Sequence, residues 1–430
     1  MKDFVEAARA VLRDNDRGGY TVPTRGLYPY QWNWDAAFCA LGWITFDEAR
    51  AWRELERLLE GQWPDGLVPH IVFHAPSDSY FPGPDVWRTP HVPATSGITQ
   101  PAVLASAARL CLERARDKAA AEDHLAALYP KMLAWHRWWI VARDPERSGL
   151  VGMLHPWESG MDNSPAWDAP FARVSPTPMS TIRRKDLGHV DAAMRPSEDF
   201  YKRAIALIDL YASLGWQPER MWAKTPFKVA DVALNAILHR ANRDLLALGR
   251  RFGTQAEQAE IAARLAITGP AIDGLWNAAA GIYQPRDLMT GERIEVRTSA
   301  GLLPLWAGVV DSGKLRVLSA TLEHWAKRAR FLVPSTAPDD PCFEPKRYWR
   351  GPIWGIVNMM IAEGLAETGA QELARRIKAD TAHLIDQNGF CEYFDPLTGD
   401  GLGGGHFSWT AAVALYWNLR NEARVEAPAN

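Results

Sequence analysis

The sequence lacks several features that would assign it to a broad class of protein. It has no run of about 18 apolar residues, so we expect no membrane span. The first 16 residues carry charges throughout and lack the apolar core of a secretory signal. No basic excess exists either, because 48 Lys and Arg against 51 Asp and Glu give a formal net charge of −3. Nucleic acid and anionic membranes both require a basic face, so we expect neither as a partner, and we expect a cytoplasmic protein.

Several catalytic and metal-binding motifs are also missing. The four cysteines show no C-x-x-C spacing, and there is no Walker A sequence, no G-x-S-x-G elbow and no H-E-x-x-H. The glycine cluster at 401–405 lacks the last glycine of a dinucleotide-binding loop. His70 and His74 lie four residues apart without an intervening Glu, which favours a pair of loop histidines over metal ligands. We therefore expect no metal and no cofactor.

Helical periodicity dominates the chain, and strand signals are few. Short apolar runs at 67–74 and 280–284 are the candidate strands. Apolar residues recur at helical spacing near the N-terminus and at 47–61, 101–114, 121–142, 199–214, 229–252, 256–268, 298–309, 313–330, 352–368, 370–386 and 409–422.

Twelve helices in six hairpins could close into an (α/α)6 toroid, with long loops gathered at one end. The fold class is therefore mainly α, and no linker divides the chain, so we expect one catalytic domain over 1–430. An open solenoid or a long bundle is the alternative. The stretches 75–100 and 156–198 are long, polar and rich in Pro and Gly, which is typical of functional loops.

Tryptophan is abundant, with 20 residues. Buried Trp needs a partner for its ring N–H, so this number suggests flat apolar surfaces for a ligand such as a sugar, although a Trp-rich core would give the same composition.

Acidic residues stand among these aromatics in separate segments. Asp35 follows Trp32 and Trp34 and is either a helix N-cap or a carboxylate beside two rings that accepts hydrogen bonds from a sugar. Glu158 and Asp162 lie in HPWESGMDNSP (155–165), whose composition also suits a simple turn.

Two further segments follow the same pattern. In YWRGPIWGIVN (348–358) the rings could be core, but the embedded Arg350 is harder to bury without a partner. Glu392 stands between Cys391 and Tyr393, a setting that raises a carboxyl pKa unless a cation lies near. Two acids from distant segments suit glycoside hydrolysis. One acid protonates the leaving oxygen, and the other either attacks the sugar or activates a water molecule.

Five segments resemble motifs of glycoside hydrolase family 63 in identity and order. They are QWNWDAAF (31–38), ESGMDNSP (158–165), YWRGPIW (348–354), NGFCEYFDPLTG (388–399) and FSWTAAV (407–413). The resemblance implies an (α/α)6 toroid that hydrolyses α-glucosidic or α-mannosidic bonds with inversion. The compact bacterial members include hydrolases of mannosylglycerate and glucosylglycerate.

The same resemblance implies roles for individual residues. Asp162 would be the general acid and Glu392 the general base. Residues implied at the sugar or its aglycone are Tyr28, Trp32, Trp34, Asp35, Gln100, Glu158, Arg195, Tyr348, Gly351, Trp354 and Trp409. Candidates for binding a substrate carboxylate are Tyr80, Trp87, Tyr348 and His406. We would expect an amide side chain near position 406 in glycerate-cleaving relatives, so a neutral α-glucoside stays open as the substrate.

We therefore predict an inverting α-glycosidase whose two carboxyl groups lie roughly 6.5–9.5 Å apart, since about 5–5.5 Å would indicate retention. Glu158 and Asp35 are the candidate neighbours that keep Asp162 protonated, and an Arg is expected near Glu392. An epimerase on the same toroid is an alternative and would need His70, His155 or His406. A sugar-binding protein without turnover is another, and would not need both acids. The oligomeric state is left open.

Overall fold

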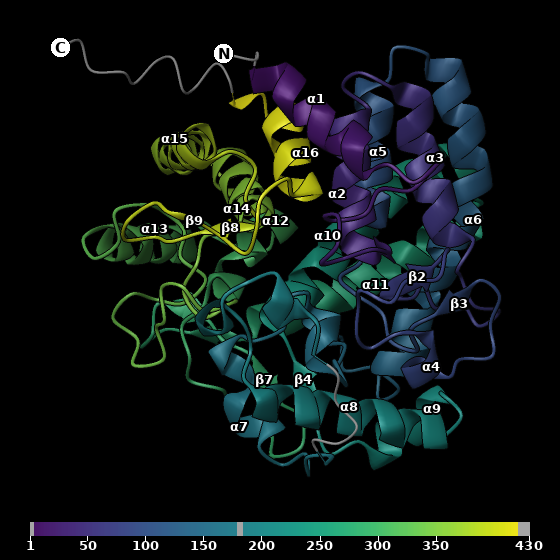
Figure 1. Cartoon of the computed structure of the whole chain (residues 1–430), viewed down its shortest axis with the longest axis horizontal. Coiled ribbons are helices and arrows are strands. Elements are labelled where there is room, and N and C mark those ends of the chain that lie inside the picture. The colour runs from purple at the N-terminus through teal and green to yellow at the C-terminus, as the bar shows by residue number, and fades with distance from the viewer. Residues whose placement is uncertain (1–3, 179–183, 420–430) are drawn as a thin grey trace.

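Six helices pack side by side into a closed ring in the computed structural model, which describes residues 4–178 and 184–419 (Figure 1). Each ring helix contacts the next, and the last, α16, packs against the first, α2, which excludes an open solenoid. The ring is formed by α2 (Asn33–Trp43), α5 (Leu104–Arg114), α10 (Val232–Phe252), α12 (Pro304–Ala307), α14 (Gly355–Glu367) and α16 (Ser408–Tyr416).

An outer layer surrounds this ring, because the helix before or after each ring helix folds back along the chain. The outer helices are α1 (Phe4–Asn15), α3 (Glu48–Leu59), α6 (Lys118–Arg143), α11 (Gln255–Asp273), α13 (Ser312–Ala326) and α15 (Gln371–Asn388). Their sequences differ from those of the ring: every residue of α2 is buried, whereas α3 buries one face only. The expectation of a mainly α, (α/α)6 fold is confirmed.

Short elements lie in the connections. The remaining helices are α4 (Pro84–Trp87), α7 (Asp168–Phe171), α8 (Glu198–Ser213) and α9 (Pro218–Lys224). The strands are β1 (Gln31–Trp32), β2 (Ile71–Phe73), β3 (Ala94–Thr95), β4 (Val229–Ala230), β5 (Trp276–Asn277), β6 (Ile282–Tyr283), β7 (Arg286–Asp287), β8 (Tyr393–Phe394) and β9 (Gly401–Leu402). The antiparallel sheet β1-β2-β3 ties the loop before α2 to the stretch 75–100.

Most predicted helices match an observed one within a few residues, but 298–309 does not. A 3-10 turn, Ser299–Leu302, precedes the four-residue α12, which begins at Pro304 and ends where Gly308 adopts a φ of 74°. The prediction of one continuous helix there was wrong because apolar spacing alone does not register a proline start and a glycine stop so close together.

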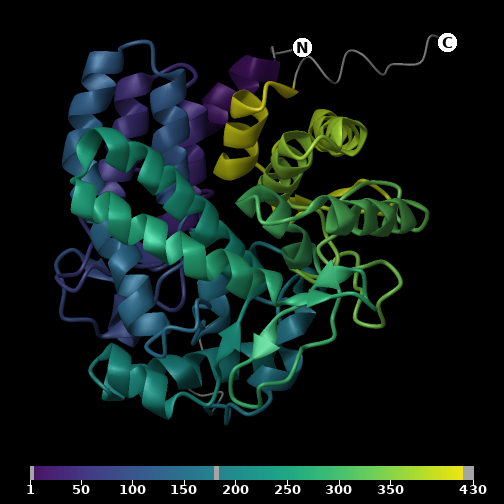
Figure 2. The ribbon, with the colours of Figure 1, turned by 180° about the vertical axis from the view of Figure 1, so that it is seen from behind.

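The reverse view shows α10 and α11 crossing the back of the molecule, with α13 to α15 on one side (Figure 2).

Within the described residues, no helix combines the length and the apolarity that crossing a lipid bilayer requires.

Candidate active site

The loops at one end of the ring enclose a cavity that gathers most of the predicted site residues. Those that line it are Tyr28, Trp32, Trp34, Asp35, Tyr80, Gln100, Asp162, Arg195, Tyr348, Glu392 and Trp409. They come from both ends of the chain, with 364 positions between Tyr28 and Glu392, so the ring closure of α16 on α2 is what brings them together.

Glu392 lines this cavity, immediately before β8, with no exposed surface. Its Oε1 accepts hydrogen bonds from the hydroxyls of Tyr28, at 3.3 Å, and Tyr348, at 3.2 Å. Its Oε2 has no hydrogen-bond partner among the described residues. Burial raises the pKa of Glu392 to about 7, while the positive charge of Arg195 and the two tyrosine hydrogen bonds oppose that rise.

Arg195 is the cation that acts on these carboxyl groups. Its Nε donates to Asp186 at 3.1 Å, and its Nη1 donates to the Tyr28 hydroxyl at 2.8 Å. Its guanidinium also lies over the Tyr348 ring, 4.4 Å from the centroid. Arg195 is 4% exposed and lines the cavity, so its guanidinium can serve a ligand that enters there.

Asp162 enters the cavity from a turn. The 3-10 helix Pro156–Ser159 ends at Gly160, whose φ of 69° reverses the chain so that the Asp162 side chain lines the cavity. Burial and the negative charge of Glu392 raise the pKa of Asp162 well above its usual value, and Arg195 acts against them. The neighbour that raises this pKa is therefore Glu392 rather than Glu158, one of the two expected. The other expected neighbour, Asp35, has its own pKa raised in part by Asp162.

Asp35 supplies a third carboxyl group. It lies in the first turn of α2, which begins at Asn33 after the N-cap residue Trp32, so the alternative interpretation of Asp35 as the N-cap was wrong. Burial and the charge of Glu392 raise the pKa of Asp35 well above its usual value. Gln100 holds the same turn, since its Oε1 accepts from the backbone N–H of Trp34 at 3.2 Å.

Aromatic rings form the walls of the cavity. Trp32 meets Tyr28 edge-to-face at a centroid distance of 5.3 Å and Tyr80 at 5.1 Å. His70 lies edge-to-face with Trp32 and stacks against Trp157 at 6.1 Å, and both His70 and Trp157 also line the cavity. Sugar rings pack on such surfaces through their C–H faces, which is the use that the tryptophan content suggested.

Two of the predicted site residues, Trp87 and Trp354, are packed in the core and do not line the cavity. Trp87 is fully buried between His70, Trp157 and Trp216. Trp354 stacks on Trp349 at 3.8 Å with the ring planes 2° apart, and both rings are buried.

Three other predicted site residues also lie away from the cavity. Glu158 is fully buried in an ion pair with Arg143, at 2.7 Å. Gly351 is required by packing, because a Cβ there would lie 2.4 Å from the Glu344 carbonyl oxygen. His406 is exposed and has a φ of 54°.

Sequence reasoning missed Asp186 and Tyr201, which also line the cavity. Asp186 pairs with both Arg184, at 2.7 Å, and Arg195, at 3.1 Å, and accepts from the Tyr201 hydroxyl at 3.3 Å. Part of the long stretch that carries Asp186, residues 179–183, lies outside the described chain. The polar composition of that stretch marked it as functional but did not single out Asp186.

The histidines needed for the epimerase alternative do not meet in the cavity. His155 is buried with both ring nitrogens bonded to backbone, Nε2 to the Ala204 carbonyl and Nδ1 to the Trp157 N–H. His406 is exposed elsewhere, which leaves His70 as the one of the three that lines the cavity. Within residues 4–178 and 184–419, no three His, Cys, Asp or Glu side chains gather in a way that could hold a metal ion.

The chain is similar over most of its length to known proteins. The model of a family described as the mannosylglycerate hydrolase MGH1-like glycoside hydrolase domain matches residues 28–410. A mannosylglycerate hydrolase of Thermus thermophilus is 50% identical over 410 residues, 95% of this chain and 98% of that protein. A glucosylglycerate hydrolase of Mycolicibacterium hassiacum is 35% identical over 436 residues, 96% of this chain and 97% of that protein.

A crystal structure is similar as well. That of a family 63 mannosylglycerate hydrolase from Thermus thermophilus, in complex with Tris and D-glycerate, superposes with a TM-score of 0.94 at 49% identity. The match covers 97% of this chain and all of that one.

Proposed function

The chain belongs to the MGH1-like glycoside hydrolases of family 63, and from that premise we propose that it hydrolyses the α-mannosidic bond of mannosylglycerate with inversion. It is a glycosidase. The observation that carries the finer proposal is the cavity itself, in which Asp162 and Glu392 face a space that also holds Arg195. The α-glucosidic bond of glucosylglycerate is the second candidate, because a relative that covers nearly the whole chain acts on that substrate.

In this mechanism Asp162 acts as the general acid. Its raised pKa favours the protonated carboxyl, and that proton passes to the glycosidic oxygen as the bond to the sugar breaks. Aromatic walls and the negative charge of ionised carboxylates stabilise the oxocarbenium-like transition state.

Glu392 acts as the general base on the opposite face of the sugar. Arg195 and the hydroxyls of Tyr28 and Tyr348 favour its ionised form, and Oε2 has no partner within the described chain, so it can accept a proton from the attacking water. The proton leaves water, oxygen bonds to the anomeric carbon, and inversion follows.

The glycerate carboxylate is assigned to Arg195. Of the residues expected to bind that group, Trp87 and His406 do not reach the cavity, whereas Tyr80 and Tyr348 line it together with the Arg195 guanidinium. A guanidinium and two phenols suit a carboxylate, because hydrogen bonds to charged groups are the strong ones.

The proposal also includes one catalytic domain over residues 1–430 in the cytoplasm. A hydrophobic core that runs from Ala8 to Tyr416 supports the first point. Four unpaired cysteines are in keeping with the second.

The test follows hydrolysis by proton NMR, with mannosylglycerate and glucosylglycerate as substrates. We expect the β-anomer of mannose to appear first and glucosylglycerate to be cleaved more slowly. Early α-anomer would indicate retention and contradict the assignment of Glu392 as a base.

A second substrate distinguishes the roles of Asp162 and Glu392. The fluoride ion of α-mannosyl fluoride leaves without needing a proton. Asp162→Asn should therefore keep its turnover of α-mannosyl fluoride, while its turnover of mannosylglycerate should fall roughly 10²–10⁴-fold. Glu392→Gln should lose both. Equal losses on both substrates in Asp162→Asn would remove Asp162 from the role of acid.

A further inference from the structure

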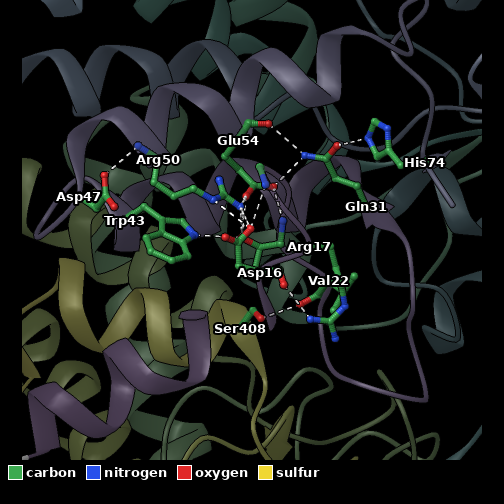
Figure 3. Close-up of polar contacts among 12 residues, drawn as sticks. Asp16, Arg17, Val22, Gln31, Trp43, Asp47, Arg50, Glu54, His74 and Ser408 are labelled. Carbon is green, nitrogen blue, oxygen red and sulfur yellow. Dashed lines mark hydrogen bonds and ion pairs between the residues drawn. The ribbon is translucent and has the colours of Figure 1, made fainter. Parts of the chain in front are cut away.

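A buried carboxylate outside the cavity, Glu54 of α3, bonds to both ends of one cavity loop (Figure 3). At the first end, Oε1 accepts from the Thr21 N–H at 3.1 Å and Oε2 accepts from the Thr21 hydroxyl at 2.6 Å. At the second end, Oε1 accepts from Gln31 Nε2 at 2.8 Å. Residues 22–30 therefore form a loop whose two ends converge on one side chain.

This loop carries Tyr28 into the cavity. The Tyr28 hydroxyl accepts from Arg195 at 2.8 Å and donates to Glu392 at 3.3 Å, so it links the cation to the proposed base. The loop is also tied to the start of α16, where Ser408 Oγ donates to the Val22 carbonyl at 2.7 Å. No described hydrogen bond joins Glu54 itself to the cavity residues, so its hydrogen bonds act on the cavity through the loop. Its charge acts directly only as a minor contribution to the raised pKa of Asp35.

The partners of Glu54 are held in turn. Arg50 Nη2 donates to Glu54 at 2.8 Å and also to Asp16, at 2.9 Å, and to the Thr21 hydroxyl, at 3.0 Å. Arg50 therefore also holds the first end of the loop in place, together with Glu54 (Figure 3).

His74 fixes the amide of Gln31 at the second end. Gln31 Nε2 donates to Glu54, so its Oε1 faces His74 Nε2 at 2.8 Å and accepts a hydrogen bond from it. Arg57 Nη2 then donates to His74 Nδ1 at 3.1 Å, which requires a neutral ring. Burial and the charge of Arg57 lower the pKa of His74 to about 4, so the ring is neutral and this orientation persists at neutral pH.

We propose that Glu54 is a positioning residue of the active site, which holds Tyr28 against Glu392 by tying the two ends of loop 22–30 together. The inference rests on the proposed function, in which Glu392 is the general base. A purely structural ion pair could be replaced by apolar residues with little loss. Glu54 instead accepts four side-chain hydrogen bonds, and three of them come from the loop ends.

The test is the pH dependence of kcat/KM in Glu54→Gln, with Tyr28→Phe as the reference. A glutamine amide has one acceptor oxygen, so at least one loop bond must be lost: either the Thr21 hydroxyl bond at Oε2, or the two bonds at Oε1, one from each end of the loop. Tyr28 then moves off Glu392, the pKa of Glu392 rises, and the acidic limb of the profile moves to higher pH. One pH unit of movement lowers kcat/KM about tenfold on that limb.

The decisive comparison is the double variant. If Glu54 acts through Tyr28, Glu54→Gln combined with Tyr28→Phe shifts the limb no further than Tyr28→Phe alone. Additive shifts, or an unshifted limb in a folded Glu54→Gln protein, would overturn the proposal.

Two further variants keep the test sharp. Thr21→Val removes the hydroxyl bond to Glu54 at one end of the loop and keeps the backbone N–H bond. It should shift the limb in the same direction by a smaller amount, which covers the case in which Glu54→Gln does not fold. Asp244→Asn breaks a matched buried ion-pair network on α10, with Arg109 and Arg240, and should lower thermal stability without moving the limb. An equal shift in Asp244→Asn would make the effect of Glu54 a general loss of stability and overturn its positioning role.

The proposed function fails in a different way. If Glu392→Gln keeps its activity, Glu392 is not the base, whatever Glu54 does. If Glu392→Gln is inactive and Glu54→Gln leaves the limb in place, the proposed function stands and the positioning role alone is overturned.

Discussion

Glu158, in the turn that presents Asp162, forms an ion pair of 2.7 Å with Arg143 at the end of α6, and their side-chain exposures are 0% and 1%. The second oxygen of Glu158 accepts from the Leu154 N–H at 2.7 Å. The carboxylate is therefore fully engaged within the protein, and its contribution to the site is to hold the turn rather than to contact a sugar.

Glu158→Ala should lower the free energy of unfolding by about 3–5 kcal/mol, because it leaves Arg143 buried without its partner. Chemical denaturation measures this change. Asp209→Ala is the control, since it breaks a half-exposed pair with Arg88 and should cost at most about 1 kcal/mol. Equal losses in the two variants would contradict the role given to Glu158.

Gly160→Ala should distort the turn that presents Asp162 by steric overlap. Gly160 has a φ of 69°, and a Cβ there would lie 2.6 Å from the Trp34 ring. Overpacking of this kind costs about 1–3 kcal/mol, and it should push Asp162 out of place and lower kcat. Gly215→Ala is a matched control, with a φ of 66° and open space around its Cβ. It shares the backbone strain without the clash, so it should keep kcat. A Gly160→Ala enzyme with unchanged kcat would show that the turn tolerates the shift.

The fold was largely predictable because apolar residues recur at helical spacing in the outer helices and in most ring helices. The ring helix α2, whose residues are all buried, was not among the predicted ranges. The continuous helix expected at 298–309 failed, since α12 is confined between Pro304 and Gly308.

The site was predictable in part. Acids among aromatics marked Asp35, Asp162 and Glu392, but an aromatic run reads the same in a core as in a cavity wall. The sequence therefore could not show that Trp354 is a core residue and Trp32 a cavity residue. Trp354 is in the core because it stacks on Trp349, a contact that exists only in the folded chain.

Activity should fall on the acidic side of neutrality. The base must be ionised, and burial raises the pKa of Glu392 to about 7, so kcat/KM should rise with pH up to that value and fall about tenfold per unit well below it. Tyr348→Phe removes a hydrogen bond that favours the carboxylate, so it should move this limb to higher pH. Tyr283→Phe, at a buried tyrosine that bonds Asp273 away from the cavity, should leave the profile unchanged. A limb that stays in place in Tyr348→Phe would mean that it reports a group other than Glu392.

Arg195 should decide between a charged and a neutral aglycone. If it binds the glycerate carboxylate, Arg195→Gln loses a charge-assisted hydrogen bond worth about 1.5–3 kcal/mol, which is roughly 10–150-fold in kcat/KM on mannosylglycerate. Arg195→Gln also removes the positive charge that favours the ionised form of Glu392. Methyl α-mannoside has no carboxylate, so the loss of activity on that substrate measures this second effect alone. Arg184→Gln is the matched control: Arg184 pairs with the same Asp186 at 2.7 Å but does not line the cavity, so both substrates should suffer equally. Equal losses on both substrates in Arg195→Gln would assign Arg195 to the electrostatics of Glu392 alone. The carboxylate of the substrate would then need another partner.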